Sequence, residues 1–176
     1  GGITSYMEMP NTVPQATTIS ELEKKYARAA ECSLANYSFY MGGTNHNLEE
    51  ALKTDFSKVC GLKVFMGSST GDMLVDHEQV LEGFFSRISG LIATHCEFDP
   101  LVKANQERIV AEYGEDITAE FHPVIRSEEA CYKSSSMAVA LAKKHGTRLH
   151  ILHLSTAKEL SLFDNNIPLK EKRITA

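Results

Sequence analysis

The chain has 176 residues, of which 43% are hydrophobic and 23% charged, and its formal net charge is −5. This composition is typical of a globular domain with one sizeable core. The negative charge argues against a nucleic-acid partner and an acidic membrane surface, because both favour a basic patch. No apolar run approaches the roughly 18 to 20 residues of a membrane span.

The ends and the cysteines suggest where the chain comes from. It begins as GGITSYMEMP, inside a strand-like segment, and stops at KEKRITA, where another strand is predicted to start. We therefore expect it to be cut from a longer protein. The four cysteines are widely spaced and no secretory signal is visible, which favours free thiols in a reducing cytoplasm.

In chain order, short strands alternate with helices. Strands are predicted at residues 2–9, 36–41, 59–66, 90–96 and 148–154, and a sixth begins at the end of the chain. Helices are predicted from Ser20 to about Ser33, after Asn47, from Asp76 to about Ile88, over residues 100–114, and from Ser127 to about His145. Such alternation indicates a parallel sheet covered by helices.

The spacing fits an α/β fold of the (β/α)8 TIM-barrel type, whose chemistry lies at the carboxyl ends of the strands. A complete barrel usually needs about 250 residues. No segment rich in glycine, proline or serine divides the chain. We expect residues 1–176 to form the central part of a single barrel domain, incomplete because its first and last strands are missing.

Lys63 interrupts an otherwise apolar strand, GLKVF, and an unpaired buried amine is costly. Alternate residues of a strand face opposite sides, so Lys63 shares a face with Gly61 and Phe65. The other face carries Leu62 and Val64, which suit contact with helices. Lys63 is therefore predicted to face the barrel interior.

Two histidines near strand ends are predicted to point at the same mouth. His95 ends one strand, and by strand parity His153 shares a face with Ile151 and Leu149, whereas His150 has the opposite parity. Together with the strand lysine, the two imidazoles suggest a metal site. A histidine at a strand end is also commonly a hydrogen-bonded filler, and a strand lysine commonly reaches solvent at the rim, so both readings stay open here.

Five segments occur in an order that resembles dihydroorotases, which are cyclic amidohydrolases of pyrimidine biosynthesis. The segments are MPNT (9–12), GLKVFMGSSTG (61–71), THCE (94–97), HPVIRSEEA (122–130) and LHILHLST (149–156). The resemblance covers essentially the whole chain. The segments SSTG and HCE are more similar to dihydroorotase than to dihydropyrimidinase or allantoinase.

The resemblance implies a binuclear Zn2+ centre within a TIM-type barrel. Lys63 matches the carboxylated lysine that bridges the two metals, a catalytic as well as a metal-binding role. His95 and His153 match two histidines that bind one of the metals.

The resemblance also implies substrate contacts. Asn11 matches an asparagine that contacts the substrate carboxylate, and Ser69 and Thr70 lie in the loop over the substrate. The implied reaction is the reversible, zinc-dependent hydrolysis of dihydroorotate to N-carbamoyl-L-aspartate.

This chain also departs from the family pattern. An HxH pair of metal ligands, an arginine for the substrate, and the aspartate that serves as acid and base are missing from it. We therefore expect the chain alone to be inactive, with absent or partial zinc and an uncarboxylated Lys63.

Other functions remain open from the sequence. The source protein could be another cyclic amidohydrolase, such as a hydantoinase, dihydropyrimidinase or allantoinase. It could instead be a non-catalytic scaffold for aspartate transcarbamoylase, although a scaffold has no need of the lysine and the two histidines. A homodimer is also consistent with the resemblance.

Overall fold

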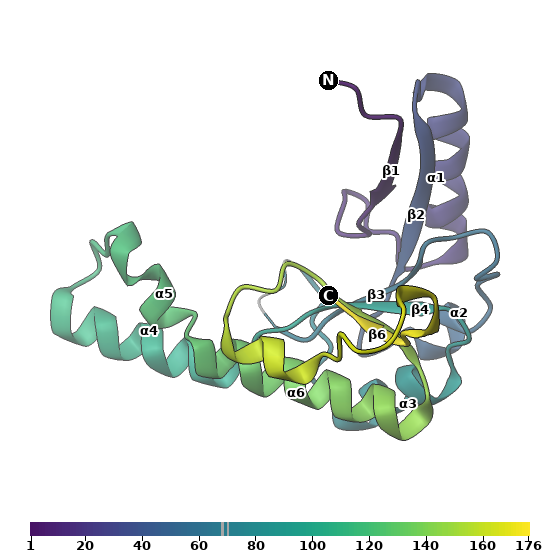
Figure 1. Ribbon diagram of the computed structural model, residues 1–176. Helices are drawn as coiled ribbons and strands as arrows, with labels where there is room; N and C mark the ends of the chain where they lie inside the picture. Colours follow the sequence, from purple (N-terminus) through teal and green to yellow (C-terminus); the bar gives the residue numbers. More distant parts are fainter. Residues whose placement is uncertain (68, 70) are drawn as a thin grey trace.

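The computed structural model describes residues 1–67, 69 and 71–176. Within these residues, six strands form one sheet in chain order, and each is parallel to the next (Figure 1). The strands are β1 Ser5–Glu8, β2 Asn36–Gly42, β3 Gly61–Phe65, β4 Leu91–His95, β5 Arg148–Ile151 and β6 Ile174–Thr175. Strands adjacent in sequence are thus adjacent in space, as in a (β/α) barrel. The expected α/β fold class is confirmed.

Helical segments connect the strands. They are α1 Ile19–Cys32, α2 Leu48–Ala51, α3 Glu78–Arg87, α4 Asp99–Tyr113, α5 His122–Ile125 and α6 Glu128–His145, with short 3-10 helices η1 Ala119–Phe121, η2 Lys158–Leu162 and η3 Leu169–Glu171. Figure 1 shows α3 and α6 on the same side of the central strands, whereas α4 and α5 extend away from the sheet. In the described part of the chain, no helix is both long and apolar enough to span a membrane.

Two long helices begin with side-chain caps, as their sequences require. The Ser127 hydroxyl accepts a hydrogen bond from the Ala130 N–H at the start of α6, which confirms the predicted cap. At α1 the cap is Thr18, whose side chain accepts from the Glu21 N–H. The prediction of Ser20 was wrong by two residues, because the threonine before it satisfies the first turn.

One face of the sheet forms the core against the helices. Leu62, Ile92 and Leu149 lie in one register row across β3, β4 and β5, and all three are fully buried. They belong to one apolar cluster with Phe84 of α3 and Val139 of α6. This packing fixes which side of the central strands is left to face the barrel interior.

The face opposite the helices carries the polar candidates. Lys63 pairs in register with Ala93, and Ala93 pairs with His150. Residues paired directly across parallel strands share a face. The predicted inward orientation of Lys63 is therefore confirmed, and His150 lies on the same face.

The residues of β5 face the side opposite to the one predicted from strand parity. Leu149 and Ile151 were expected on the interior face, but Ile151 pairs in register with Thr94 and both leucine and isoleucine join the helix-facing core. A regular continuation of β5 would therefore point His153 at the helices. Its position at the mouth needs another cause, which the loop after β5 provides.

Replacing Leu149 tests this orientation of β5. Leu149→Ala should lower the free energy of unfolding by about 2–5 kcal/mol, because the side chain is fully enclosed by the core. The matched change Leu160→Ala, at a leucine that is 62% exposed, should cost less than about 0.5 kcal/mol. Urea denaturation measures both, and equal losses would contradict the packing.

Candidate metal centre

The candidate site lies where β3, β4 and β5 end. Phe65 and His95, the last residues of β3 and β4, pair in register. β5 ends at Ile151, after which the Leu152 N–H donates to the Thr94 carbonyl oxygen over 3.0 Å. The carboxyl ends of the three strands therefore meet at one edge of the sheet, where barrel enzymes carry their chemistry.

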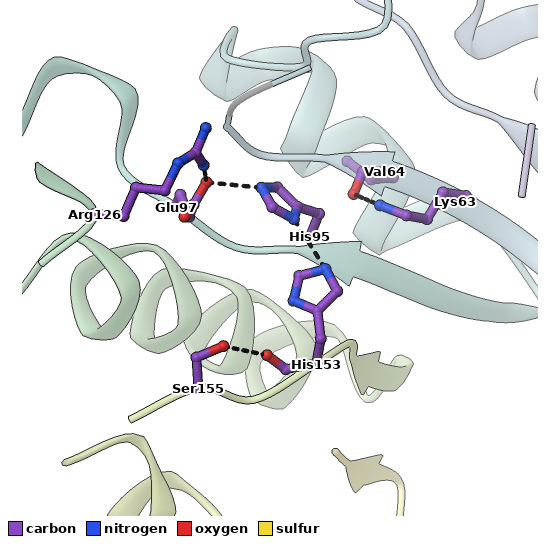
Figure 2. Close-up of polar contacts among 7 residues, drawn as sticks. All are labelled: Lys63, Val64, His95, Glu97, Arg126, His153 and Ser155. Carbon is purple, nitrogen blue, oxygen red and sulfur yellow. Dashed lines mark hydrogen bonds and ion pairs between the residues drawn. The ribbon is translucent and has the colours of Figure 1, made fainter. Parts of the chain in front are cut away.

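His153 reaches this edge through a turn. Its backbone has a φ of 41°, in the left-handed region that residues other than glycine rarely adopt. This conformation breaks the strand alternation, and the imidazole turns toward β4. The Nε2 atom of His153 lies 3.0 Å from the Nδ1 atom of His95 (Figure 2). The two predicted ligands are thus brought together, although not by the predicted route.

Lys63 is buried beside them, with 2% of its surface exposed. Its Nζ donates to the Val64 carbonyl oxygen over 3.1 Å and lies 3.5 Å from the centre of the Phe65 ring. Burial lowers the pKa of this amine to about 7, since the charged form loses its water. Near neutral pH a large fraction of the lysine is therefore uncharged.

The two histidines fit zinc as neighbouring ligands. Nitrogen ligands of one tetrahedral zinc ion, bound at 2.0–2.1 Å, lie about 3.3 Å apart, close to the 3.0 Å between the ring nitrogens of His95 and His153. Burial, reinforced by His95, lowers the pKa of His153, which favours the neutral imidazole that a metal binds. Among residues 1–67, 69 and 71–176, no three His, Cys, Asp or Glu side chains form a metal-binding cluster.

Two charged residues at this site, Glu97 and Arg126, were not predicted from the sequence. The Nε2 atom of His95 lies 3.0 Å from the Oε2 atom of Glu97, and the Arg126 guanidinium pairs with that same oxygen (Figure 2). The Glu97 side chain is only 10% exposed. Both residues occur in segments that were singled out, THCE and HPVIRSEEA, but nothing in the spacing of 29 residues joins them.

No protein-family model matches the chain. Among curated proteins, it is 31% identical to an L-hydantoinase of Paenarthrobacter aurescens, over 92% of this chain and 36% of that protein. It is 30% identical to an allantoinase of Deinococcus radiodurans and 24% identical to a dihydroorotase of Methanosarcina mazei; each match covers 92% of this chain, with 37% and 35% of those proteins.

A solved structure extends the similarity to the fold. The L-hydantoinase (dihydropyrimidinase) from Arthrobacter aurescens superposes with a TM-score of 0.84 at 28% identity, over 92% of this chain and 36% of that one. The chain is thus similar in sequence and fold to cyclic amidohydrolases. It spans about a third of the length of the curated relatives it matches.

The relatives share one class of reaction and differ in substrate. Proteins named hydantoinase, allantoinase and dihydroorotase each match 92% of this chain, at 24–31% identity. All three names describe hydrolases of cyclic amides. Both the activity and the substrate of this protein are therefore matters for proposal.

The loops expected to contact substrate lie near each other. Asn11 is exposed on the loop after β1. A Cβ atom on Gly71 would come within 2.6 Å of the Gln15 side chain, so the loop after β3 packs against the loop after β1. Ser69 belongs to that second loop, whereas Thr70 lies outside the described residues. The substrate contacts of all three predicted residues stay predictions.

Titration of Lys63 should be visible in the stability of the metal-free protein. The pKa of this amine is about 7 when folded and near 10.5 when exposed, so between these values the unfolded chain binds more protons and stability rises with pH. Lys63→Met removes that rise. The free energy of unfolding of Lys63→Met, relative to that of the wild type, should therefore fall by on the order of 3 kcal/mol between pH 7 and pH 10.

Urea denaturation in metal-free, CO2-free buffer at several pH values measures that difference. The matched change Lys53→Met, at a surface lysine whose side chain is 65% exposed, should shift stability equally at each pH. Parallel curves for wild type and Lys63→Met would contradict the buried neutral amine.

The turn at His153 predicts an inverted order of two variants. Because its φ is 41°, His153→Gly should be about 1 kcal/mol more stable than His153→Ala. At His150, inside β5, the usual order should hold, with alanine more stable than glycine. Thermal or urea unfolding of the four variants checks this, and a more stable His153→Ala would exclude the left-handed turn.

Proposed function

We propose that this protein is a zinc-dependent cyclic amidohydrolase that converts dihydroorotate reversibly to N-carbamoyl-L-aspartate in pyrimidine biosynthesis. The observation that supports a metal-dependent hydrolase is the 3.0 Å approach of two ring nitrogens, from His95 and His153, beside a buried lysine whose pKa is about 7. These groups lie at the carboxyl ends of parallel strands, which is where barrel enzymes hold their substrates.

In this proposal Lys63 acts after addition of CO2. The lone pair of the neutral amine forms an N–C bond with CO2, and one proton leaves the nitrogen for water. The neutral amine thereby becomes an anionic carbamate, whose oxygens would offer ligands to a metal. The low pKa of the lysine supports this step, because only an uncharged amine can react.

The histidines provide neutral nitrogen ligands. His95 would offer Nδ1 and His153 would offer Nε2, the two atoms that already face each other. Bound zinc would supply a Lewis acid that polarises the ring carbonyl and lowers the pKa of water. The chain itself supplies the enclosed position and the orientation of both rings.

The preference for dihydroorotate rests on its carboxylate. The resemblance of Asn11, Ser69 and Thr70 to the substrate-contacting positions of dihydroorotases supports a site for that group. Asn11 is exposed on the loop after β1. An amide can donate to a carboxylate without bringing a charge of its own.

A second candidate is a hydantoin or allantoin as substrate. It is favoured by the 31% identity to an L-hydantoinase, against 24% for the dihydroorotase of Methanosarcina mazei, and by the TM-score of 0.84 with an L-hydantoinase structure. Hydantoins lack the ring carboxylate of dihydroorotate. A contact from Asn11 to that carboxylate would then have no role.

Turnover by the zinc-loaded, full-length gene product distinguishes the candidates. We expect kcat/KM for dihydroorotate to exceed that for a 5-substituted hydantoin, allantoin and dihydrouracil by about 100-fold or more, since a site built for a polar group discriminates strongly. Asn11→Ala should raise KM for dihydroorotate. His95→Ala should remove activity, whereas His145→Ala, at the far end of α6, should retain it.

Other outcomes assign other functions. Preference for a hydantoin or allantoin would replace the substrate and keep the hydrolase class. A full-length protein that binds no zinc and hydrolyses none of the four compounds would contradict the proposal. Copurification with aspartate transcarbamoylase would then support the scaffold alternative.

A further inference from the structure

The His95 ring has a polar neighbour at each of its nitrogens. Nδ1 faces His153 Nε2 at 3.0 Å, and Nε2 faces Glu97 Oε2 at 3.0 Å. A carboxylate accepts hydrogen bonds and cannot donate them. The proton of a neutral His95 ring must therefore lie on Nε2, which leaves the lone pair on Nδ1.

Backbone contacts hold Glu97 in this position. The Phe98 N–H, next to it, donates to the Ala130 carbonyl oxygen at the start of α6 over 3.0 Å. On the other side, a Cβ atom on Gly67 would lie 1.9 Å from the Glu97 carbonyl oxygen, so only glycine permits the loop after β3 to pack there. The backbone of Glu97 is thus held between the start of α6 and the loop after β3, and its side chain is only 10% exposed.

Arg126 arrives from a separate part of the chain. It directly follows α5, and its N–H donates to the His122 carbonyl oxygen over 2.9 Å. The side chain of Asn105 in α4 donates to the Ile125 carbonyl oxygen over 3.1 Å. The α4–α5 extension, which projects from the sheet (Figure 1), therefore places the Arg126 guanidinium at the edge where β4 ends.

We propose that Glu97 and Arg126 are positioning residues that fix His95 with its proton on Nε2 and its Nδ1 lone pair facing the metal position. This inference rests on the proposed function, because it assigns residues that prepare the same metal centre. Arg126 holds the Glu97 oxygen, and Glu97 holds the ring. Carboxylate partners of this kind orient metal-binding histidines in many proteins, and their loss typically weakens metal affinity about 10- to 100-fold.

A purely structural role would have different consequences. An ion pair that only joined α5 to β4 would add stability without selecting a tautomer of His95. The Arg87–Glu49 pair, 2.6 Å between Nη1 and Oε1 on the surface, provides a matched control of that kind. Its removal should leave the metal centre unchanged.

The test uses the full-length gene product with Glu97→Ala, Arg126→Met, Arg126→Lys and the control Arg87→Met. Zinc affinity is measured by competition with a chromophoric chelator. We expect a weakening of roughly 10- to 100-fold for Glu97→Ala, a smaller one for Arg126→Met, partial recovery in Arg126→Lys, and none in Arg87→Met. Melting temperatures show whether each variant is folded.

Nitrogen-15 NMR of the imidazoles in the metal-free protein gives the second readout. We expect the Nε2-protonated tautomer of His95 in the wild type and a mixture of tautomers in Arg126→Met, which also decides the case if Glu97→Ala does not fold. A wild type in which the His95 ring is protonated on Nδ1 would overturn the inference. Zinc affinities of Glu97→Ala and Arg126→Met within twofold of wild type would also overturn it.

The same data separate this inference from the proposed function. A wild type that binds no zinc contradicts the metal-dependent hydrolase, and the tautomer of His95 still decides the positioning role. A wild type that binds zinc and hydrolyses dihydroorotate, with variants that bind zinc equally well, contradicts the positioning role alone.

Discussion

The in-register parallel pairing of β3, β4 and β5 is the constraint on which the site depends. It places Leu62, Ile92 and Leu149 together under the helices, and it leaves Lys63 on the opposite face. Burial of the apolar row stabilises the sheet, since each fully buried aliphatic side chain contributes about 1.5–3 kcal/mol. A fold held by that row can retain a lysine whose charged form is destabilised by burial.

The polar groups reach the edge of the sheet by three routes. Lys63 and His95 come from regular strands, His153 comes from a left-handed turn after β5, and Arg126 comes from the junction of α5 and α6. Only the strand residues are placed by the register. The others depend on the loop after β5 and on the α4–α5 extension, which projects from the sheet.

Strands, helices and the inward face of Lys63 were predictable from the sequence, because apolar alternation and capping residues are local signals. The pairing of His153 with His95 was predicted for the wrong reason. Strand parity assumes an extended backbone, whereas His153 adopts a φ of 41°. The Glu97–Arg126 pair was missed, because it depends on how α4 and α5 return to the sheet. The only sequence signal for this pair is that THCE and HPVIRSEEA each contain charged residues.

Zinc-edge anomalous diffraction from crystals of the full-length gene product, grown with zinc, tests the central claim most directly. The account predicts an anomalous peak about 2.0–2.1 Å from His95 Nδ1 and from His153 Nε2, with Glu97 still paired to the opposite nitrogen of the His95 ring. A peak bound to His95 Nε2, or one remote from both histidines, would contradict it.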